Sequence, residues 1–423
     1  MTTRTAAKAV PIHRQSLFDI PRSISVTVLV VLIGELALAW ATAGTPDVDI
    51  WQSFARTVDR VGPIDIYSLP IQDAGLMVYN HPPLIGWWLM VVNAGADIGI
   101  PFGFLIRLPS ILAHAATTLL VFAILRTRVA ERVARNSALL VAVSPVLLII
   151  AGFHGNNDPV MVMFTIAAVW LLVDRRQPVL AGLAFSLAMS VKVVPVVALP
   201  LLLVAAWGLG RRDLVRFVLG AIPVFVVLWL PVLIIAGGGF ISHVIGYTGS
   251  GFPRQWGPYK FLEFFGLPER PLLIYQNKGI YLVLALAALL PAWFIRRTPQ
   301  RAPAALGLSL GIFLLISPGW APQYTSWVAA VVFFIEFVPA AIFTGVAGLV
   351  YLVLYTQWAG NRLWDYANVT TLTRDQVAIL GLAWLALVPC VVVGLVQFLR
   401  PSRDVEAQPS GSRQPAAAEQ QTE

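Results

Sequence analysis

Long apolar stretches recur along the chain from residue 24 to residue 399, and short polar or basic connections separate them. A helix that crosses the hydrocarbon core of a bilayer needs about 20 mostly apolar residues. Because backbone polar groups cannot stay unpaired in lipid, these stretches are expected to be helices. We predict an all-α, polytopic transmembrane helical bundle of about twelve spans. The spans are expected near residues 24–43, 105–125, 136–153, 158–173, 179–191, 193–209, 214–236, 279–295, 303–317, 324–337, 340–357 and 377–399.

The arginines resolve an ambiguity in this count, because basic residues gather on the cytoplasmic side of membrane proteins. They cluster at Arg4–Arg22, Arg126–Arg135, Arg175–Arg176, Arg211–Arg216, Arg296–Arg301 and Arg400–Arg413. If all six clusters are cytoplasmic, an even number of spans separates each pair. The apolar stretch 84–98 would break this rule as a span, so we predict a surface or re-entrant helix there.

The predicted layout has three parts. A cytoplasmic tail covers 1–23, a transmembrane domain covers 24–399, and a polar, disordered cytoplasmic tail covers 400–423. Two long outer loops are expected at about 44–104, with interfacial helices, and 237–278. The first apolar stretch lacks a clear cleavage pattern, so we expect a retained anchor.

Composition supports a membrane protein. The chain is 58% hydrophobic and only 12% charged, whereas a soluble domain is about one quarter charged. The net charge of +8 follows from the basic connections and does not indicate a nucleic-acid partner. The single cysteine, Cys390, excludes a disulfide within the chain.

Polar residues collect at the predicted outer ends of the spans. They are Asp47 and Asp49 in PDVDIWQSFART, Tyr79 and His81 in YNHPPL, His154, Asn156, Asn157 and Asp158 in GFHGNNDP, Lys192 in SVKVVP, Arg254 and Trp256 in FPRQWGPYK, and Gln323 and Tyr324 in SPGWAPQY.

Taken singly, most of these residues have structural explanations. The aspartates of the first loop are typical helix caps, and aromatic residues at span ends are typical of the interfacial belt. Lys192 is harder to explain, because an isolated ammonium at membrane depth needs a partner or water. Glu35, inside the first span, is given no role. Together, Lys and Arg suit a lipid-linked phosphate, and a carboxylate suits a general base.

These motifs resemble those of GT-C-type glycosyltransferases, the polytopic enzymes that use polyprenyl- or dolichyl-phosphate sugars, with similarity to bacterial mannosyltransferases and asparagine-linked-glycosylation glucosyltransferases. The first-loop segment from Asp49, the YNHPPL element, the HGNND turn, Lys192 with its following prolines, and SPGWAPQY all resemble family elements. The resemblance favours Asp49 over Asp47 as the catalytic carboxylate. The chain lacks a large C-terminal soluble domain, which disfavours the oligosaccharyltransferase branch.

The resemblance implies a hexosyl- or pentosyltransferase in a membrane, expected to be a bacterial plasma membrane, with both termini cytoplasmic and an extracytoplasmic active site. A polyprenyl-phosphate sugar would be the donor, and a glycan or glycolipid the acceptor, in an inverting displacement with Asp49 as base. No cofactor is certain, and the sequence leaves a divalent metal (Mg²⁺ or Mn²⁺) open. The alternatives are a secondary transporter or flippase of lipid-linked sugars, and a non-catalytic scaffold.

Overall fold

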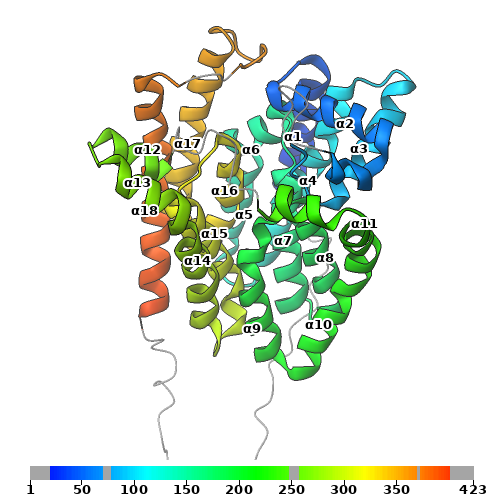
Figure 1. The fold of residues 1–423 in the computed structure, drawn as a ribbon. Helices are drawn as coiled ribbons and strands as arrows, with labels where there is room; N and C mark the ends of the chain where they lie inside the picture. Colours follow the sequence, from blue (N-terminus) through cyan, green and yellow to red (C-terminus); the bar gives the residue numbers. More distant parts are fainter. Residues whose placement is uncertain (1–19, 70–77, 247–256, 369–371, 401–423) are drawn as a thin grey trace, which may run out of the picture.

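The computed structural model describes residues 20–69, 78–246, 257–368 and 372–400, and all regular structure in these ranges is helical. Figure 1 shows the helices running mostly up and down the molecule. The all-α bundle is therefore confirmed.

Eight helical segments in the described ranges are long and apolar enough to cross a membrane. They are α1 (Arg22–Ala41), α4 (Phe102–Leu125), Glu131–His154, Arg211–Ile245, Glu269–Ile295, Pro299–Ile316, α17 (Phe337–Trp358) and α18 (Arg374–Leu399). Three shorter apolar helices lie among them: α7 (Asp158–Val173), α8 (Pro178–Val191), and a 3₁₀ turn η3 (Val194–Ala198) that continues into α9 (Leu199–Leu209).

Four of the long segments are composites of α-helix with tighter or wider turns. The segment Glu131–His154 comprises α5 (Glu131–Ala142), α6 (Pro145–Leu148) and the π-helical turn η2 (Ile149–His154). The segment Arg211–Ile245 comprises α10 (Arg211–Val224), η4 (Phe225–Trp229), α11 (Leu230–Phe240) and η5 (Ile241–Ile245). The last two are Glu269–Ile295, with α13 (Glu269–Ile274), η6 (Tyr275–Gly279) and α14 (Ile280–Ile295), and Pro299–Ile316, with η7 (Pro299–Arg301) and α15 (Ala302–Ile316).

The predicted span at 324–337 is not one continuous helix. The chain there forms η8 (Pro322–Thr325), α16 (Ser326–Ala329) and η9 (Val331–Phe334), and residues 325–335 are buried throughout. A segment enclosed by protein can pair its backbone groups without a continuous helix. Its β-branched and aromatic residues are also weak helix formers.

The first long loop is helical, as predicted. α2 (Pro46–Asp65) is followed by η1 (Ile66–Ser68), and α3 (Pro83–Asp97) occupies the stretch expected to hold a loop helix. Asn93 of α3 donates to the carbonyl of Ala55 in α2 (2.8 Å). α2 and α3 lie together at the upper end of the bundle in Figure 1. The second long loop contains α12 (Gly257–Phe264) and α13, at the side of α18.

The lower end of the bundle in Figure 1 holds the arginine-rich connections. Arg128 bonds Asp174 (2.6 Å) and Arg176 lies 3.9 Å from Asp213. Arg301 donates to the carbonyl of Gln397 near the end of α18 (3.1 Å). The basic connections therefore meet at the end of the molecule opposite α2 and α3.

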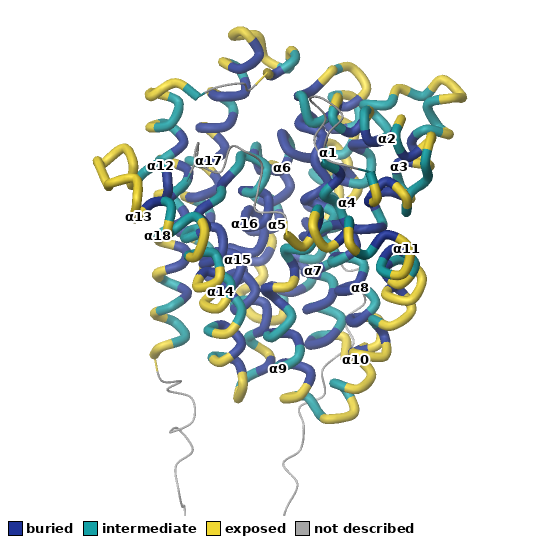
Figure 2. The backbone as a smooth tube through the Cα atoms, in the orientation of Figure 1, coloured by how far each residue is buried: buried dark blue, intermediate teal, exposed yellow. Residues whose placement is uncertain are grey.

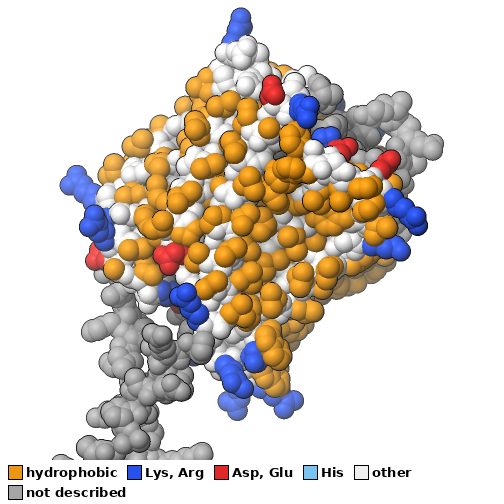
Figure 3. All heavy atoms as spheres, turned by 90° about the vertical axis from the view of Figure 1, so that its left-hand side faces the viewer, with side chains coloured by type: hydrophobic (Ala, Val, Ile, Leu, Met, Phe, Trp, Pro, Cys, Tyr) orange, Lys and Arg blue, Asp and Glu red, His pale blue; other side chains and the backbone are white. Residues whose placement is uncertain are grey.

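Burial follows the pattern expected in lipid rather than in water. Buried residues concentrate along the middle of the bundle (Figure 2), whereas α1 has only Ile24, Glu35 and Ala39 buried. Large apolar side chains such as Leu29 and Ile33 are exposed on α1. Hydrophobic side chains cover most of the face in Figure 3, and Lys and Arg lie along its margins. Such an apolar face marks a membrane protein.

Gly239 fixes how closely α11 approaches the first-loop segment. A Cβ there would overlap the carbonyl of Tyr67 in η1, whereas one at the neighbouring Gly238 would meet nothing within 4 Å. Glycine at 239 therefore lets α11 pack directly against η1.

We expect Gly239→Ala to lower the thermal unfolding temperature, because overpacking against rigid backbone costs about 1–3 kcal/mol. Gly238→Ala is the matched control, and its gain in helix propensity should leave stability equal or raised by up to about 1 kcal/mol. Tryptophan fluorescence during heating of the detergent-purified variants checks this. Equal unfolding temperatures for the two variants would contradict the assigned contact.

Candidate active site

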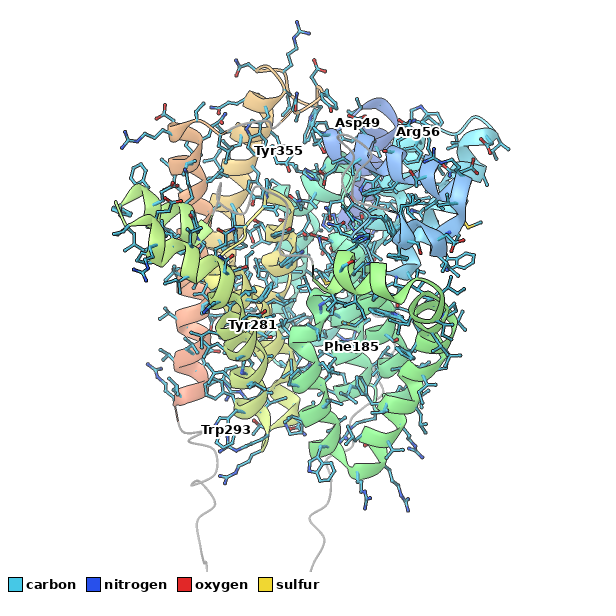
Figure 4. The ribbon with its side chains drawn as sticks, viewed as in Figure 1. Asp49, Arg56, Phe185, Tyr281, Trp293 and Tyr355 are labelled. Atoms are coloured by element: carbon cyan, nitrogen blue, oxygen red, sulfur yellow. The ribbon has the colours of Figure 1, made fainter. Side chains whose placement is uncertain are left out.

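The two first-loop aspartates face different surroundings. Thr45 caps α2, accepting from the backbone N–H of Asp47 (3.3 Å). Residues two apart on a helix point about 200° apart, so Asp47 and Asp49 diverge. Asp47 turns toward the bundle with its side chain 30% exposed. Asp49 is exposed and accepts from the Tyr366 hydroxyl (2.6 Å); Figure 4 labels it on α2 in the upper part of the molecule.

Asp47 is held through one carboxylate oxygen. Its Oδ2 lies 3.0 Å from His154 Nε2 and accepts from Asn156 Nδ2 at 3.4 Å. Burial by itself raises the pKa of Asp47, but His154, Asn156 and Lys192 together bring it below the usual range. The group is therefore an ionised carboxylate, and Oδ1 is the oxygen not used in these contacts.

The turn that carries His154 and Asn156 is fixed from three helices, α2, α4 and α17. His154 is the last residue of the π-helical turn η2, and such turns frequently occur at functional sites. Thr45 donates to the carbonyl of His154 (2.8 Å), Trp51 to that of Gly155 (2.8 Å) and Ser110 of α4 to that of Asn156 (2.6 Å). On the far side, the Tyr355 hydroxyl of α17 lies 2.6 Å from His154 Nδ1.

An ion pair between Asp158 and Lys192 extends the site. Lys192 Nζ lies 2.5 Å from Asp158 Oδ1, and the indole of Trp327 donates to Oδ2 (2.7 Å). The ammonium also lies 5.0 Å from the ring centre of Tyr324 and 5.5 Å from that of Trp327, distances typical of cation–π contacts. The Lys192 side chain is 20% exposed, so the ammonium is paired with Asp158 and is still accessible to a ligand.

His81 forms an aromatic wall beside Asp47 and Lys192. Its ring centre lies 4.3 Å from that of Trp51, and its carbonyl accepts from the Tyr67 hydroxyl (2.7 Å). Tyr79 packs edge-on against Tyr67 and Phe54. Burial lowers the pKa of His81 and Lys192 lowers it further; Asp47 acts in the opposite direction, and the value is about 3. His81 is therefore neutral at physiological pH.

Asn157 differs from its neighbours because its amide lacks protein partners. The residue is 5% exposed, and within the described ranges neither Nδ2 nor Oδ1 makes a hydrogen bond. A buried, unpaired amide is costly, and such groups often await a ligand or water. Asn157 lies between Asn156 and Asp158, which contact Asp47 and Lys192 respectively.

The structure brings together most of the residues predicted from sequence. Asp47, His81, His154, Asn156, Asp158, Lys192 and Tyr324 interact with one another through bonds or charges. Gln323 is half-buried, and its backbone carbonyl accepts from Ser326. Arg254 and Trp256 lie outside the described residues.

Four contributors were missed: Trp51, Trp327, Tyr355 and Tyr366. Trp51 stands within the PDVDIWQSFART motif, and Trp327 lies three residues after the SPGWAPQY motif, so a signal was present near both. Tyr355 lies in an apolar span and Tyr366 in a polar connection, without a neighbouring motif. In the described part of the chain, no three His, Cys, Asp or Glu side chains are grouped to hold a metal ion.

Comparison with known proteins identifies the family. The model for glycosyltransferase family 87 matches residues 81–318, more than half of the chain. The chain belongs to glycosyltransferase family 87. It is thus a GT-C-type glycosyltransferase and a multi-pass integral membrane protein. The matched residues include His81, the HGNND turn and Lys192, whereas Asp47 and Asp49 precede them.

A solved structure and the curated proteins add little to this family 87 assignment. The apo crystal structure of the Archaeoglobus fulgidus oligosaccharyltransferase is similar at 14% identity with a TM-score of 0.36, covering 91% of this chain and 58% of that one. The chain therefore spans less than two thirds of that protein's length. No curated protein matches the chain.

The neutral state of His81 predicts a pH dependence of stability. The unfolded chain's histidine has a pKa near 6.5 whereas the folded one is about 3, so the unfolded state binds more protons between these values. Stability therefore falls as pH drops below about 6.5. Replacing His81 by Gln removes this contribution, so between about pH 7 and 4.5 the unfolding temperature should fall less, by on the order of 2–4 °C. Parallel curves for both proteins would contradict a neutral, half-buried His81.

Proposed function

We propose that this family 87 enzyme transfers one sugar from a polyprenyl phosphate to a hydroxyl of a glycan or glycolipid, with Asp47 as general base. The supporting observation is the placement of Asp47, whose Oδ2 is held by His154 and Asn156 beside the Lys192–Asp158 pair. One carboxylate oxygen is thus fixed in direction while the other stays available to a substrate.

The reaction needs one proton acceptor and one cation. The acceptor oxygen attacks the anomeric carbon while its proton passes to Asp47 Oδ1. The bond from that carbon to the phosphate oxygen breaks on the opposite face, and polyprenyl phosphate leaves with the electron pair. Because the carboxylate is a weak base, the proton moves as the new C–O bond forms. This single displacement inverts the anomeric configuration.

Lys192 suits the phosphate. An ammonium has three donors, and Asp158 uses one at 2.5 Å, so two remain for phosphate oxygens. Trp327 fixes the second oxygen of Asp158, which holds the pair in place when the donor binds. The rings of Tyr324 and His81 border the same space and suit the faces of a sugar.

Asp49, favoured by the sequence resemblance, is the alternative base. Its carboxylate is exposed and bonded to Tyr366. Burial, followed by this hydrogen bond, raises the pKa of Tyr366 to about 12. Asp49 suits a contact at the edge of the site, for example with the acceptor. Membership in a glycosyltransferase family removes the reason to retain the transporter or scaffold alternatives.

The basic connections support an orientation in which the active site is extracytoplasmic. They meet at the end opposite Asp47, and basic connections face the cytoplasm. The end of α18 lies at that basic end, where Arg301 donates to the carbonyl of Gln397. The arginine- and alanine-rich composition supports a bacterial plasma membrane as the location.

The choice between the two aspartates predicts different mutant activities. Asp47→Asn should lower kcat by roughly 10²–10⁴-fold, the usual contribution of a general base. Asp49→Asn should retain activity within about 10-fold, since it changes one hydrogen bond to Tyr366. Transfer from radiolabelled polyprenyl-phosphate mannose to glycolipids extracted from the native host, by the purified enzyme in nanodiscs, measures both. The reverse ranking would transfer the base role to Asp49.

Asn157 predicts opposite effects on stability and binding. Asn157→Ala removes a buried amide without a protein partner, so the unfolding temperature should stay equal or rise. If the amide binds the sugar, KM for the donor should rise by about 10-fold or more. Asn93→Ala, which removes a bonded amide outside the site, is the matched control and should lower stability with KM unchanged. A destabilised Asn157→Ala with normal KM would make the residue structural.

A further inference from the structure

We propose that Tyr355 is a positioning residue that selects the tautomer of His154, and that this tautomer holds Asp47 for catalysis. The inference rests on the proposed function, in that Asp47 is taken as the base. It assigns a role to a tyrosine that lies beyond the family-matched residues and in no recognised motif.

Three side chains form a continuous chain of contacts. The Tyr355 hydroxyl lies 2.6 Å from His154 Nδ1, and His154 Nε2 lies 3.0 Å from Asp47 Oδ2. Tyr355 and His154 are 3% and 7% exposed, so water does not compete freely for either ring nitrogen. In Figure 4, Tyr355 is labelled on α17, across the upper part of the molecule from Asp49 on α2.

Counting protons leaves one neutral arrangement that satisfies every contact. A neutral imidazole has one N–H donor and one bare nitrogen. If Tyr355 donates to Nδ1, then Nε2 carries the hydrogen and donates to Asp47. In the other tautomer, Nδ1–H points at the tyrosine oxygen and the bare Nε2 faces the carboxylate, which is repulsive. A donor at Tyr355 therefore selects the tautomer that binds Asp47.

The backbone around Tyr355 is fixed. Two turns earlier on α17, a Cβ at Gly348 would lie 2.8 Å from Pro145 of α6, so α17 packs closely on the helix that leads into η2. Phe153 and Trp358 contact the tyrosine ring edge-on or tilted, at centroid distances of 6.2 and 5.1 Å. The hydroxyl is thus held on His154 from a rigid helix.

Other titratable groups also face Asp47, and the test must separate them from Tyr355. Asp49 lies on its own helix, and the rest come from the elements packed around it: His81, His154, Lys192, Tyr324, Tyr355 and Tyr366. Tyr355 differs from the other groups because it bonds the His154 imidazole at Nδ1, the nitrogen opposite the one that bonds Asp47. Changing Tyr355 alters the Asp47 environment through that ring.

Tyr355→Phe tests the inference, and Tyr351→Phe is its matched control. Tyr351 lies one turn earlier on α17 and bonds Thr325 and the carbonyl of Pro322 instead of His154. Without the donor at 355, both tautomers are populated, and the bare nitrogen in one of them raises the pKa of Asp47 by repulsion. We expect kcat to fall by roughly 10-fold to 100-fold, as for other orienting partners of functional histidines.

The pH profile provides a readout that a purely structural role would not move. In Tyr355→Phe, the acidic limb of kcat for transfer from polyprenyl-phosphate mannose should shift to higher pH, whereas Tyr351→Phe should keep the wild-type limb. An unshifted limb in Tyr355→Phe would overturn the inference. If Asp47→Asn retains activity, the proposed base fails instead, and the two failures are thereby distinguished.

A second measurement reads the His154 tautomer directly and does not depend on enzyme activity. In ¹⁵N-histidine-labelled wild-type enzyme near neutral pH, the His154 resonances, assigned by their loss in His154→Gln, should show a bare Nδ1 and a protonated Nε2. Tyr355→Phe should add the opposite tautomer. A wild-type spectrum with bare Nε2, or with both nitrogens protonated, would refute the role of Tyr355.

Discussion

The buried guanidinium of Arg107 fixes the junction on which the active site depends. It is fully buried on α4 and donates to the carbonyls of Ala39, Thr42 and Ala43, at 3.1, 3.0 and 2.7 Å. These are the free carbonyls at the end of α1, where a cation also opposes the negative end of the helix dipole. A Cβ at Gly44 would overlap the guanidinium, so the chain passes directly over it before α2 begins. The position of Asp47 follows from this clamp.

The site then combines two aspartates whose carboxylate oxygens are bonded to different extents. Asp158 has both carboxylate oxygens occupied, by Lys192 and Trp327, whereas Asp47 uses one oxygen for His154 and Asn156. The fully bonded acid suits holding a cation, and the half-bonded acid suits accepting a proton. This difference in hydrogen bonding assigns the proposed roles without reference to their position in sequence.

The sequence predicted the bundle, the loop helix at α3 and most of the site, because apolar length, arginine clusters and polar span ends are local signals. The family resemblance favoured Asp49 as the base, whereas we propose Asp47. That choice depends on where α2 begins, at Pro46, and on which side of the helix meets the turn at His154. Tyr355 and Arg107 gave no signal, since each acts across the fold on residues distant in sequence. The interrupted segment at 324–337 was missed because hydropathy measures polarity and not helical continuity.

Glu35 has no role in the proposed chemistry, but it holds α1 against α4. Its carboxylate lies 2.7 Å from His114 Nδ1 of α4, both side chains are 1% exposed, and His114 Nε2 lies 3.0 Å from the carbonyl of Val141. In lipid, apolar contact alone gives little reason for a helix to prefer one neighbour, and α1 buries only three residues. α1 therefore has polar contacts to α4 at two points along its length, Glu35–His114 in its interior and the Arg107 clamp at its end. Together they specify the rotation of α1 about its axis and its position along α4. Because α2 follows α1 after four residues, that registration sets the direction in which Asp47 points.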